Sequence, residues 1–452
     1  MSPKATENHN EQRLNLVASR LETGSLSSLR SLINALHPAE IAHLLESLQP
    51  GDRKLVWALV VSQVAGEVLV ELNDEVRNGL IEATNAEDLI SATESLASDD
   101  LVDLLKDFPA VVLDKVLESM DMQNRSRLES VLSFDDDTAG GLMSMDALTV
   151  RADVVLDVVF RYLRLRGEIP ALTDSLIVVN RYDDFQGVLP LSVLLTHEPQ
   201  ATVAEVMNTD FEAIPYDLPA AEVALLFEQR DLVSAPVVAE NGRLLGRITI
   251  DDVVDVIRDE ADHSIMSMAG LDEEQDMFAP VVNSAKRRAL WLGVNLFTAF
   301  LASWVIGWFE ATLEQIVALA VLMPVVASMG GIAGSQTLTL VIRGLALRQI
   351  NNANALNLLH QEIAIGALNG VTWAFVVAIV AGIWFKNASL GMLLGCAMLI
   401  NLICAALAGA AIPMVLQRMR IDPALAGGVL LTTITDVVGF VAFLGLATVF
   451  LL

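Results

Sequence analysis

The distribution of charge along the chain constrains its fold more than any other sequence feature. Residues 286–452 hold only five acidic and eight basic side chains and are otherwise almost wholly apolar. Residues 1–285 hold the other 51 acidic and 20 basic side chains, a net charge of −31. This division rules out a single soluble domain, and 452 residues suffice for two to four domains. An acidic body also repels phosphate, which argues against nucleic acid as a partner and favours multivalent cations.

The apolar part predicts five membrane-spanning helices. Each stretch reaches the roughly 20 residues that a helix needs to cross a bilayer. Seven of the eight basic residues fall in loops on the N-terminal side and only Lys386 falls on the other, so the positive-inside rule places the N-terminus in the cytoplasm and the C-terminus outside. The polar N-terminus is not a signal peptide. The expected spans are 289–309, 315–342, 355–385, 389–416 and 424–452.

The second span is irregular at membrane depth. Pro324 removes a backbone donor, and three glycines over 330–334 weaken the helix that follows. Polar side chains come next, at Ser335, Gln336 and Thr337. A broken backbone is tolerated in lipid only where protein or a water-lined cavity satisfies it. The segment is either a kink between packed helices or part of a pore, and the fifth span favours the pore.

The fifth span carries a carboxylate near mid-membrane. Asp436 is the thirteenth residue of 424–452, and a lone charge there costs at least about 2.5–3.5 kcal/mol. One interpretation is a protonated acid bonded to a neighbouring helix. We favour a ligand for a hard cation, assisted by the oxygens of Thr432, Thr433 and Thr435. Mg²⁺ keeps much of its water, so one or two carboxylates with carbonyls suit it better than a closed cage.

Residues 26–133 predict a run of short amphipathic helices. Apolar positions recur every three or four residues and prolines punctuate the run, which is typical of a curved helical superhelix. Asp99 and Asp103 lie four residues apart, so a helix places both carboxylates on one face. From this pair alone, a solvated acidic face is the more ordinary interpretation.

Residues 138–262 contain an internal duplication. Each copy has the order strand, helix, strand, turn, strand, helix, with apolar strands at 177–179 and 236–238. Asn241-Gly242 is a hairpin turn signal in the second copy. We expect the two copies to pack face to face and bury their sheets.

The stretch that joins this duplication to the first span is strongly acidic. It is either a solvated linker or a set of charges that attracts cations to a pore mouth. Its acids are Asp252, Asp255, Asp259, Glu260, Asp262, Asp272, Glu273, Glu274 and Asp276.

With these features in place, the whole chain resembles the MgtE family of magnesium channels and transporters. The motifs are DDDTAGGLM (135–143), PVVASMGGIAGSQT (324–337), RIDPALAGG (420–428) and TTITDVVGF (432–440). The resemblance implies a multidomain fold: a flexible N-terminus (1–25), an all-α superhelical N-terminal domain (26–133), tandem α+β CBS domains (138–200 and 201–262), a long connecting plug helix (263–285) and an all-α transmembrane domain of five helices (286–452).

The resemblance also implies partners and site residues. It implies a homodimer in a bacterial inner membrane, with a pore formed mainly by the second and fifth spans. Asp436 matches the family's pore carboxylate for hydrated Mg²⁺, and Thr432 matches a position with a pore-facing carbonyl. The positions that match regulatory Mg²⁺ ligands are Asp99, Asp103, Asp231, Asp252, Asp255, Glu260 and Asp422.

Two departures from the family pattern stand out. The second span usually reads Gly-Gly-Asn-x-Gly, and here Ile332 occupies the Asn position, which removes an amide that could affect conductance or selectivity. CBS domains that bind adenine nucleotides commonly hold the ribose with an Asp near the start of the final helix. The second copy has Asp252 there and the first has Val193, so nucleotide binding stays an open expectation.

The sequence therefore predicts Mg²⁺ transport through a dimeric pore that closes when cytosolic Mg²⁺ binds the acidic surfaces. Alternatives are transport of another divalent cation such as Co²⁺, or a poorly conducting membrane-anchored cation or nucleotide sensor. Proton coupling is also open, because a pore carboxylate can carry protons. The chain has no P-loop, HExxH or GxSxG motif and its histidines are dispersed, which argues against an enzyme.

Overall fold

The computed structural model describes residues 16–17, 19–21, 26–93, 96–119, 122–271, 275–351 and 353–452. The predicted flexible segment 1–25 and the acids Asp272, Glu273 and Glu274 fall largely or wholly outside these residues. The chain forms two compact units. Unit 1 comprises Met1–Asp262 and Glu274–Pro280, and unit 2 comprises His263–Glu273 and Val281–Leu452.

Unit 1 begins with short helices, as the amphipathic pattern predicts. They are α2 (Leu26–Ile33), α3 (Pro38–Glu46), α4 (Pro50–Trp57), α5 (Ser62–Val70), α6 (Asp74–Ile81), α7 (Ala86–Thr93), α8 (Ser98–Lys106), α9 (Ala110–Ser119) and α10 (Met122–Val131). Prolines start α3 and α4, and the Asn73 side chain caps α6 by accepting a hydrogen bond from the Val76 N–H at 3.1 Å. Their apolar faces share one buried core.

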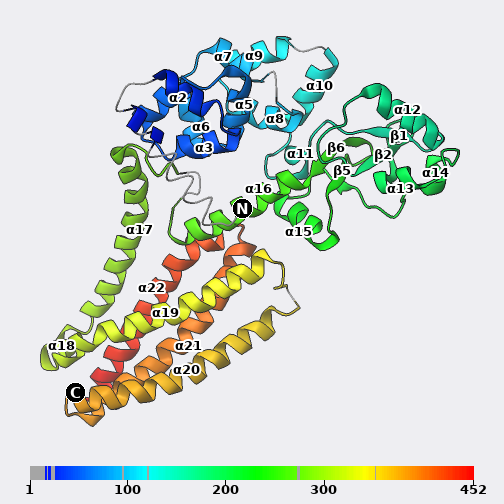
Figure 1. Cartoon of the computed structure of the whole chain (residues 1–452). Coiled ribbons are helices and arrows are strands. Elements are labelled where there is room, and N and C mark those ends of the chain that lie inside the picture. The colour runs from blue at the N-terminus through cyan, green and yellow to red at the C-terminus, as the bar shows by residue number, and fades with distance from the viewer. Residues whose placement is uncertain are drawn as a thin grey trace. The chain divides into compact units, whose positions relative to one another are not determined.

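The rest of unit 1 contains two copies of one small α+β fold (Figure 1). The first comprises α11 (Ala139–Leu142), β1 (Thr149–Arg151), α12 (Leu156–Arg166), β2 (Ser175–Val179), β3 (Phe185–Pro190) and α13 (Leu191–Thr196). The second comprises α14 (Val203–Val206), β4 (Ile214–Pro215), α15 (Ala220–Arg230), β5 (Ser234–Val238), β6 (Leu244–Thr249) and α16 (Ile250–Met268).

The two copies share one topology, which confirms the internal duplication. In each sheet the first two strands run parallel and the last two antiparallel. The copies contact each other through backbone hydrogen bonds, from Phe185 N to Gly242 O at 3.0 Å and from Leu244 N to Asp183 O at 2.9 Å. Gly242 takes the left-handed conformation (φ 81°) that the predicted turn requires.

The connecting segment differs from the single helix expected over 263–285. Helix α16 ends at Met268, and Gly270 adopts φ 67°, which L side chains disfavour. Backbone hydrogen bonds from Gly270 N to Ser267 O and from Leu271 N to Met266 O, both at 2.9 Å, close this helix end. The next helix, α17, begins at Val281, directly after Pro280. The glycine and the proline therefore break the expected plug helix into two separate helices.

Among the residues of unit 2 that the structure describes, five helices are long and apolar enough to cross a membrane, in agreement with the five predicted spans. They are α17 (Val281–Gly307), α19 (Ala318–Ala346), α20 (Ala355–Trp384), α21 (Ala388–Arg418) and α22 (Pro423–Phe450), and the short α18 (Glu310–Gln315) lies between the first two. Helix α21 is the most buried and packs against α19, α20 and α22 (Figure 1).

Candidate functional site

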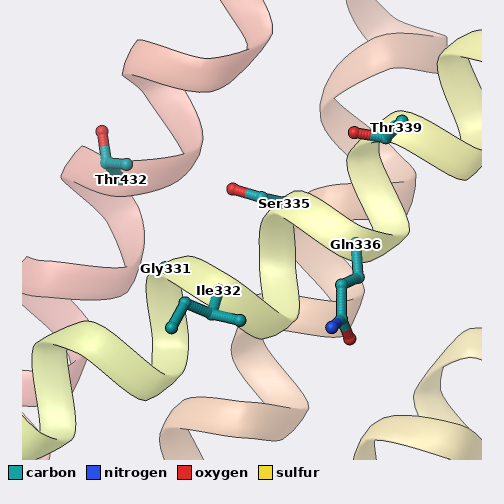
Figure 2. A pocket seen from close by; sticks show the side chains of 6 residues that line it. All are labelled: Gly331, Ile332, Ser335, Gln336, Thr339 and Thr432. Atoms are coloured by element: carbon teal, nitrogen blue, oxygen red, sulfur yellow. The ribbon is translucent and has the colours of Figure 1, made fainter.

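A groove whose lining includes hydroxyl and amide side chains lies between the second and fifth apolar helices. It has a volume of about 550 Å³ and is open on one side. Every lining residue except Thr432 of α22 comes from α19, and Figure 2 shows the Ser335 hydroxyl directed towards α22. The lining residues are Gly331, Ile332, Ser335, Gln336, Thr339 and Thr432. The second span, expected to be irregular, is one continuous helix through Pro324, and it presents Ser335 and Gln336 on an exposed face.

Asp436 lies one helical turn after Thr432, so both side chains share a face of α22. The Asp436 carboxylate is half-buried and makes no hydrogen bond or ion pair with any described residue. The Thr432 and Thr433 hydroxyls donate to carbonyls one turn back, at 2.6–3.1 Å. Thr435, which we expected to assist, is fully buried and does not line the groove. On α22 only Thr432 lines the groove, and the Asp436 carboxylate lies one turn further along the helix, outside the lining residues.

This arrangement is not a complete metal cage. Within the described part of the chain, no three His, Cys, Asp or Glu side chains converge on one point. A single carboxylate with hydroxyl and carbonyl oxygens can still hold a cation through its bound water. Mg²⁺ is the common divalent cation that most strongly retains such water.

A second acidic site lies within unit 1, where α8 meets the start of α16. Asp99 and Asp252 are two predicted ligands that lie far apart in the sequence, and in the fold they are close enough for the negative charge of Asp99 to raise the pKa of Asp252. The Asp99 Oδ1 atom is buried and has no hydrogen-bond partner among the described residues. The Asp252 carboxylate accepts a hydrogen bond from the Thr249 hydroxyl at 3.2 Å. A cation would supply the missing partner.

The pKa values at this site reflect carboxylates that lack counter-charge. Burial, followed by the negative charges of Asp99 and Asp251, raises the pKa of Asp252 from 3.8 to about 8. Burial and neighbouring carboxylates, with Asp99 first among them, raise the pKa of Asp100 to about 7. Burial also raises the pKa of Asp99. At neutral pH these packed carboxyl groups therefore either carry negative charge that no cation balances or hold a proton.

These shifts predict a pH dependence for the contact between α8 and α16. An acid whose pKa is raised in the packed state stabilises that state below its ordinary pKa, and the stabilisation is lost as pH rises from 3.8 to about 8. Without divalent cations, we expect hydrogen-exchange protection of α8 to fall between about pH 4 and about pH 8, after correction for intrinsic exchange. Saturating Mg²⁺ should remove most of that fall, and protection that is flat with pH would contradict this assignment.

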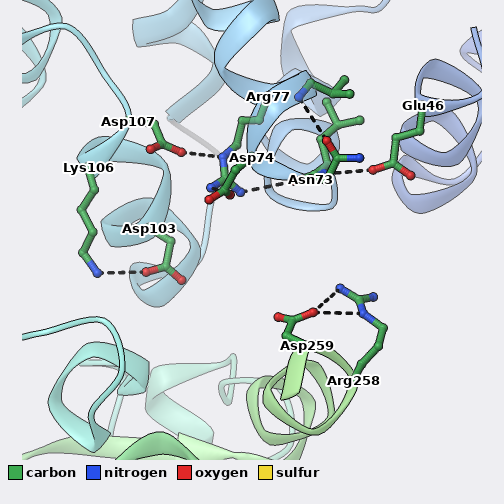
Figure 3. A network of polar contacts seen from close by, with 11 residues as sticks. Glu46, Asn73, Asp74, Arg77, Asp103, Lys106, Asp107, Arg258 and Asp259 are labelled. Carbon is green, nitrogen blue, oxygen red and sulfur yellow. Dashed lines mark hydrogen bonds and ion pairs between the residues drawn. The ribbon is translucent and has the colours of Figure 1, made fainter. Parts of the chain in front are cut away.

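The other predicted regulatory acids are not gathered at this site. Asp103 pairs with Lys106 at 3.2 Å, and Arg258 pairs with Asp259 at 3.4 Å (Figure 3). Arg258 also pairs with Asp255 at 3.5 Å. Lys106 also contacts Asp136.

Three further predicted ligands lie elsewhere. Asp231, at the end of α15, and Glu260, on α16, are exposed. Asp422 caps α22 by accepting from the N–H groups of Ala424 and Leu425 at 2.8 and 3.2 Å, and it faces His263 Nε2 at 3.4 Å. The predicted ligands therefore lie in at least three separate parts of the structure and do not form one metal site.

Sequence reasoning missed several functional groups. Asp100 and Asp251 belong to the acidic site, and their only signal was adjacency to Asp99 and Asp252. Glu362 of α20 is buried and accepts a hydrogen bond from the Thr337 hydroxyl at 3.0 Å, so Thr337 points away from the groove. An acid within an apolar span was the available signal for Glu362.

A buried ion pair fastens the segment that precedes α17 to the helical domain, within unit 1. Arg53 of α4 donates two hydrogen bonds to the Asp276 carboxylate at 2.7 and 3.0 Å, and both side chains are almost fully buried. Arg53 also donates to the carbonyls of Leu45 and Leu48 at 2.9 and 3.0 Å. The Asp276 N–H donates to Glu75 at 2.8 Å. We call this arrangement the Arg53–Asp276 latch.

Together, these features define a class of protein: a multi-pass membrane protein with a helical domain and a CBS pair outside its apolar helices. Comparison with known proteins gives the family. Residues 323–446 match the MgtE divalent cation transporter family, residues 36–137 match the MgtE intracellular N domain, and residues 203–259 match the CBS domain. The chain belongs to the MgtE family of magnesium transporters.

Its relatives cover nearly the full length. The chain is 31% identical to the magnesium transporter MgtE of Thermus thermophilus, over 95% of this chain and 97% of the relative. It is 28% identical to the magnesium transporter MgtE of Bacillus subtilis, over 95% and 96%. A solved structure of the cytosolic domain of the Mg²⁺ channel MgtE in complex with ATP is 31% identical, covers 53% of this chain and 98% of that chain, and has a TM-score of 0.48.

Proposed function

We propose that two copies of the chain form a Mg²⁺ pore, with the groove between α19 and α22 of each copy as one wall. The observation that carries this proposal is the open groove with hydroxyl and amide side chains in its lining, together with the unpaired Asp436 carboxylate one turn beyond Thr432 on the same helix. Polar groups and a charge cannot face lipid without a large cost. A second copy placed against the open side would enclose them around water.

Hydrated Mg²⁺ is the ion that this wall suits. Asp436 supplies negative charge at mid-membrane, and the oxygens around Thr432 offer acceptors to the water shell of the ion. Because few protein ligands bind the ion directly, it keeps its water and can leave again. The ion moves down its electrochemical gradient. The distribution of basic loops supports an N-terminus in the cytoplasm and a C-terminus in the periplasm of the inner membrane.

Gating follows from the acidic site in unit 1. Cytosolic Mg²⁺ bound between α8 and α16 would neutralise Asp99 and Asp252 and stabilise their packing, whereas its loss restores repulsion. Binding selects the closed state only to the extent that Mg²⁺ binds that state more tightly. The net charge of −31 on residues 1–285 also supports closure by bound cations, because cations reduce the repulsion among these acids. Asp103, Asp231, Asp255, Glu260 and Asp422 remain predicted regulatory ligands.

Neutralising the acidic site should make closure of the pore less sensitive to cytosolic Mg²⁺. In the Asp99→Asn/Asp252→Asn double variant, the repulsion that Mg²⁺ must screen is absent, so the Mg²⁺ dependence of closure should weaken by about tenfold or more. The measurement is uptake into inverted vesicles at a series of Mg²⁺ concentrations on the cytosolic face. The matched control is Asp210→Asn/Asp217→Asn, two exposed acids of the second CBS copy. Equal inhibition curves for all three proteins would reject the sensor.

A second candidate function is a membrane-anchored sensor that conducts little, because Ile332 places an apolar, 55% exposed side chain on the groove wall. Replacing Ile332 by asparagine adds a donor and an acceptor for hydrated ions, so uptake should rise several-fold. Growth of a Mg²⁺-dependent strain on limiting Mg²⁺ separates the functions. A transporter rescues growth with Ile332 in place, whereas a sensor rescues only as Ile332→Asn or not at all. Competition by Co²⁺ tests the choice of ion.

Nucleotide binding by the CBS pair is a further proposal. Asp252, the residue suited to hold a ribose, already interacts with Thr249 and the acidic site. Adenine nucleotide and Mg²⁺ would therefore compete for this carboxylate or share it.

A further inference from the structure

One buried side chain lies between the two groove helices on the side away from the groove. Asn401 of α21 is fully buried, and its Nδ2 donates a hydrogen bond to the main-chain oxygen of Val326 in α19 at 2.9 Å. Val326 is itself fully buried. A helix carbonyl has two lone pairs, so it can accept this bond in addition to its own intrahelical one.

Two glycines make room for this amide. A Cβ added at Gly330 of α19 would meet Nδ2 of Asn401 at 2.3 Å, and a Cβ added at Gly439 of α22 would meet the same atom at 2.8 Å. Atoms that close cannot coexist without movement of a helix or of the amide. Both glycines belong to motifs of the groove helices, one directly before Gly331 and the other three residues after Asp436. The Asn401 side chain of α21 therefore explains why both positions, Gly330 in α19 and Gly439 in α22, are glycine.

The amide is costly where it lies. Its Oδ1 atom is buried and has no hydrogen-bond partner within the described part of the chain. An apolar side chain of similar volume would fill the same space without that cost. The hydrogen bond to α19 and the fit against two glycines are what Asn401 provides and leucine does not.

We propose that Asn401 is a positioning residue for ion passage. It holds α19 and α22 at the spacing that sets the width of the groove, and it thereby helps to decide which hydrated cations pass. Asn401 does not touch the ion, and acts through Gly330, Val326 and Gly439. The inference rests on the proposed function, since it takes the groove as one wall of the pore.

The first test separates positioning from general stability. Asn401→Leu keeps the branched shape of the side chain, in a somewhat larger volume, and removes the hydrogen bond, and we expect Mg²⁺ uptake per folded dimer in proteoliposomes to fall about tenfold. The ratio of Co²⁺ to Mg²⁺ uptake should shift by about threefold, the factor that an average interhelical hydrogen bond in a membrane represents. A loss of folded protein lowers both rates equally and leaves this ratio unchanged. The control is Asn295→Leu, which removes a 2.9 Å bond from Asn295 to Trp291 O within α17.

The second test adds a methyl group on one side of the contact and removes the amide on the other side. Gly330→Ala alone should lower uptake strongly, because its new methyl group overlaps the amide. Adding Asn401→Ala removes that amide, so the double variant should transport faster than Gly330→Ala alone and regain part of the wild-type ion ratio. If the double variant shows the product of the uptake losses of Gly330→Ala and Asn401→Ala, Gly330 acts on the pore independently of Asn401 and the positioning role is wrong.

The outcomes also separate this inference from the proposed function. If Asp436→Asn leaves uptake unchanged, the pore itself is rejected. If Asp436→Asn abolishes uptake while the Asn401 variants keep the wild-type rate and ion ratio, only the positioning role is rejected. A shifted ratio in Asn401→Leu, absent in Asn295→Leu, supports it.

Discussion

Replacing Asp436 by asparagine is expected to abolish Mg²⁺ uptake, with a loss of about a hundredfold or more. Asparagine has almost the same shape, so packing of α22 should persist. What disappears is the negative charge at mid-membrane, and in a dimer two such charges are lost at once. Each acts on a divalent ion in surroundings of low dielectric constant, where a unit charge is worth several kcal/mol. The measurement is the initial rate of uptake into proteoliposomes under an inward Mg²⁺ gradient.

The matched control for this variant is Glu314→Gln. It makes the same change of charge in the exposed α18, outside the groove. We expect a rate close to that of the wild type. A normal rate in both variants would mean that Asp436 is not on the ion path, and equal losses in both would point to a general effect of net charge.

Breaking the Arg53–Asp276 latch is expected to have the largest effect on stability. Arg53→Met leaves the buried Asp276 carboxylate without its partner, which typically costs about 3–5 kcal/mol. Asp276 N–H and Phe278 N–H both bond to carboxylates of this network, at 2.8 Å each, so their amide exchange reports opening directly. We expect their exchange in the full-length protein to accelerate by about a hundredfold or more.

Two further variants decide how the latch works. Arg53→Met/Asp276→Leu removes both charges and should recover much of the lost protection, since no unpaired charge stays buried. Arg125→Met breaks an exposed pair with Glu129 and should cost at most about 1 kcal/mol. Equal exchange in Arg53→Met and Arg125→Met would show that the latch contributes no more than a surface pair.

The latch also bears on how the helical domain could influence the pore. Helix α17 begins at Val281, five residues after Asp276. A covalent connection of five residues, at most about 18 Å when extended, therefore joins Asp276 to the start of α17. This covalent route is separate from the one through α16.

The sequence was sufficient for features that depend on local pattern. Hydropathy predicted the five spans, and the duplicated strand order predicted two sheets of one topology, because both patterns follow from periodicity and burial. The break between α16 and α17 was visible as Gly270 and Pro280, and the family expectation of one plug helix overrode that local signal. Of the polar residues after Pro324, Ser335 and Gln336 line the groove as expected, whereas Thr337 is buried against Glu362. The irregular backbone expected at Pro324 is a continuous helix.

Contacts between distant residues could not be predicted. Arg53 and Asp276 lie 223 residues apart, and nothing in either segment distinguishes them from surface charges. The approach of Asp99 to Asp252 depends on how the helical domain packs on the second CBS copy. In the sequence, Asn401 is a single amide in an apolar helix. Its proposed role can be recognised only from the fold, where glycines of two other helices lie against it. Tertiary packing decides each of these cases.

A density map of the protein in lipid with Mg²⁺ would decide whether Asp436 lies on the ion path. The account predicts a dimer in which the two Asp436 side chains face one water-filled conduit between the α19 and α22 helices of both copies, with density for a hydrated ion beside them. Asp436 facing lipid, or closed in a dry contact between helices, would leave the groove without an ion and remove the basis for permeation.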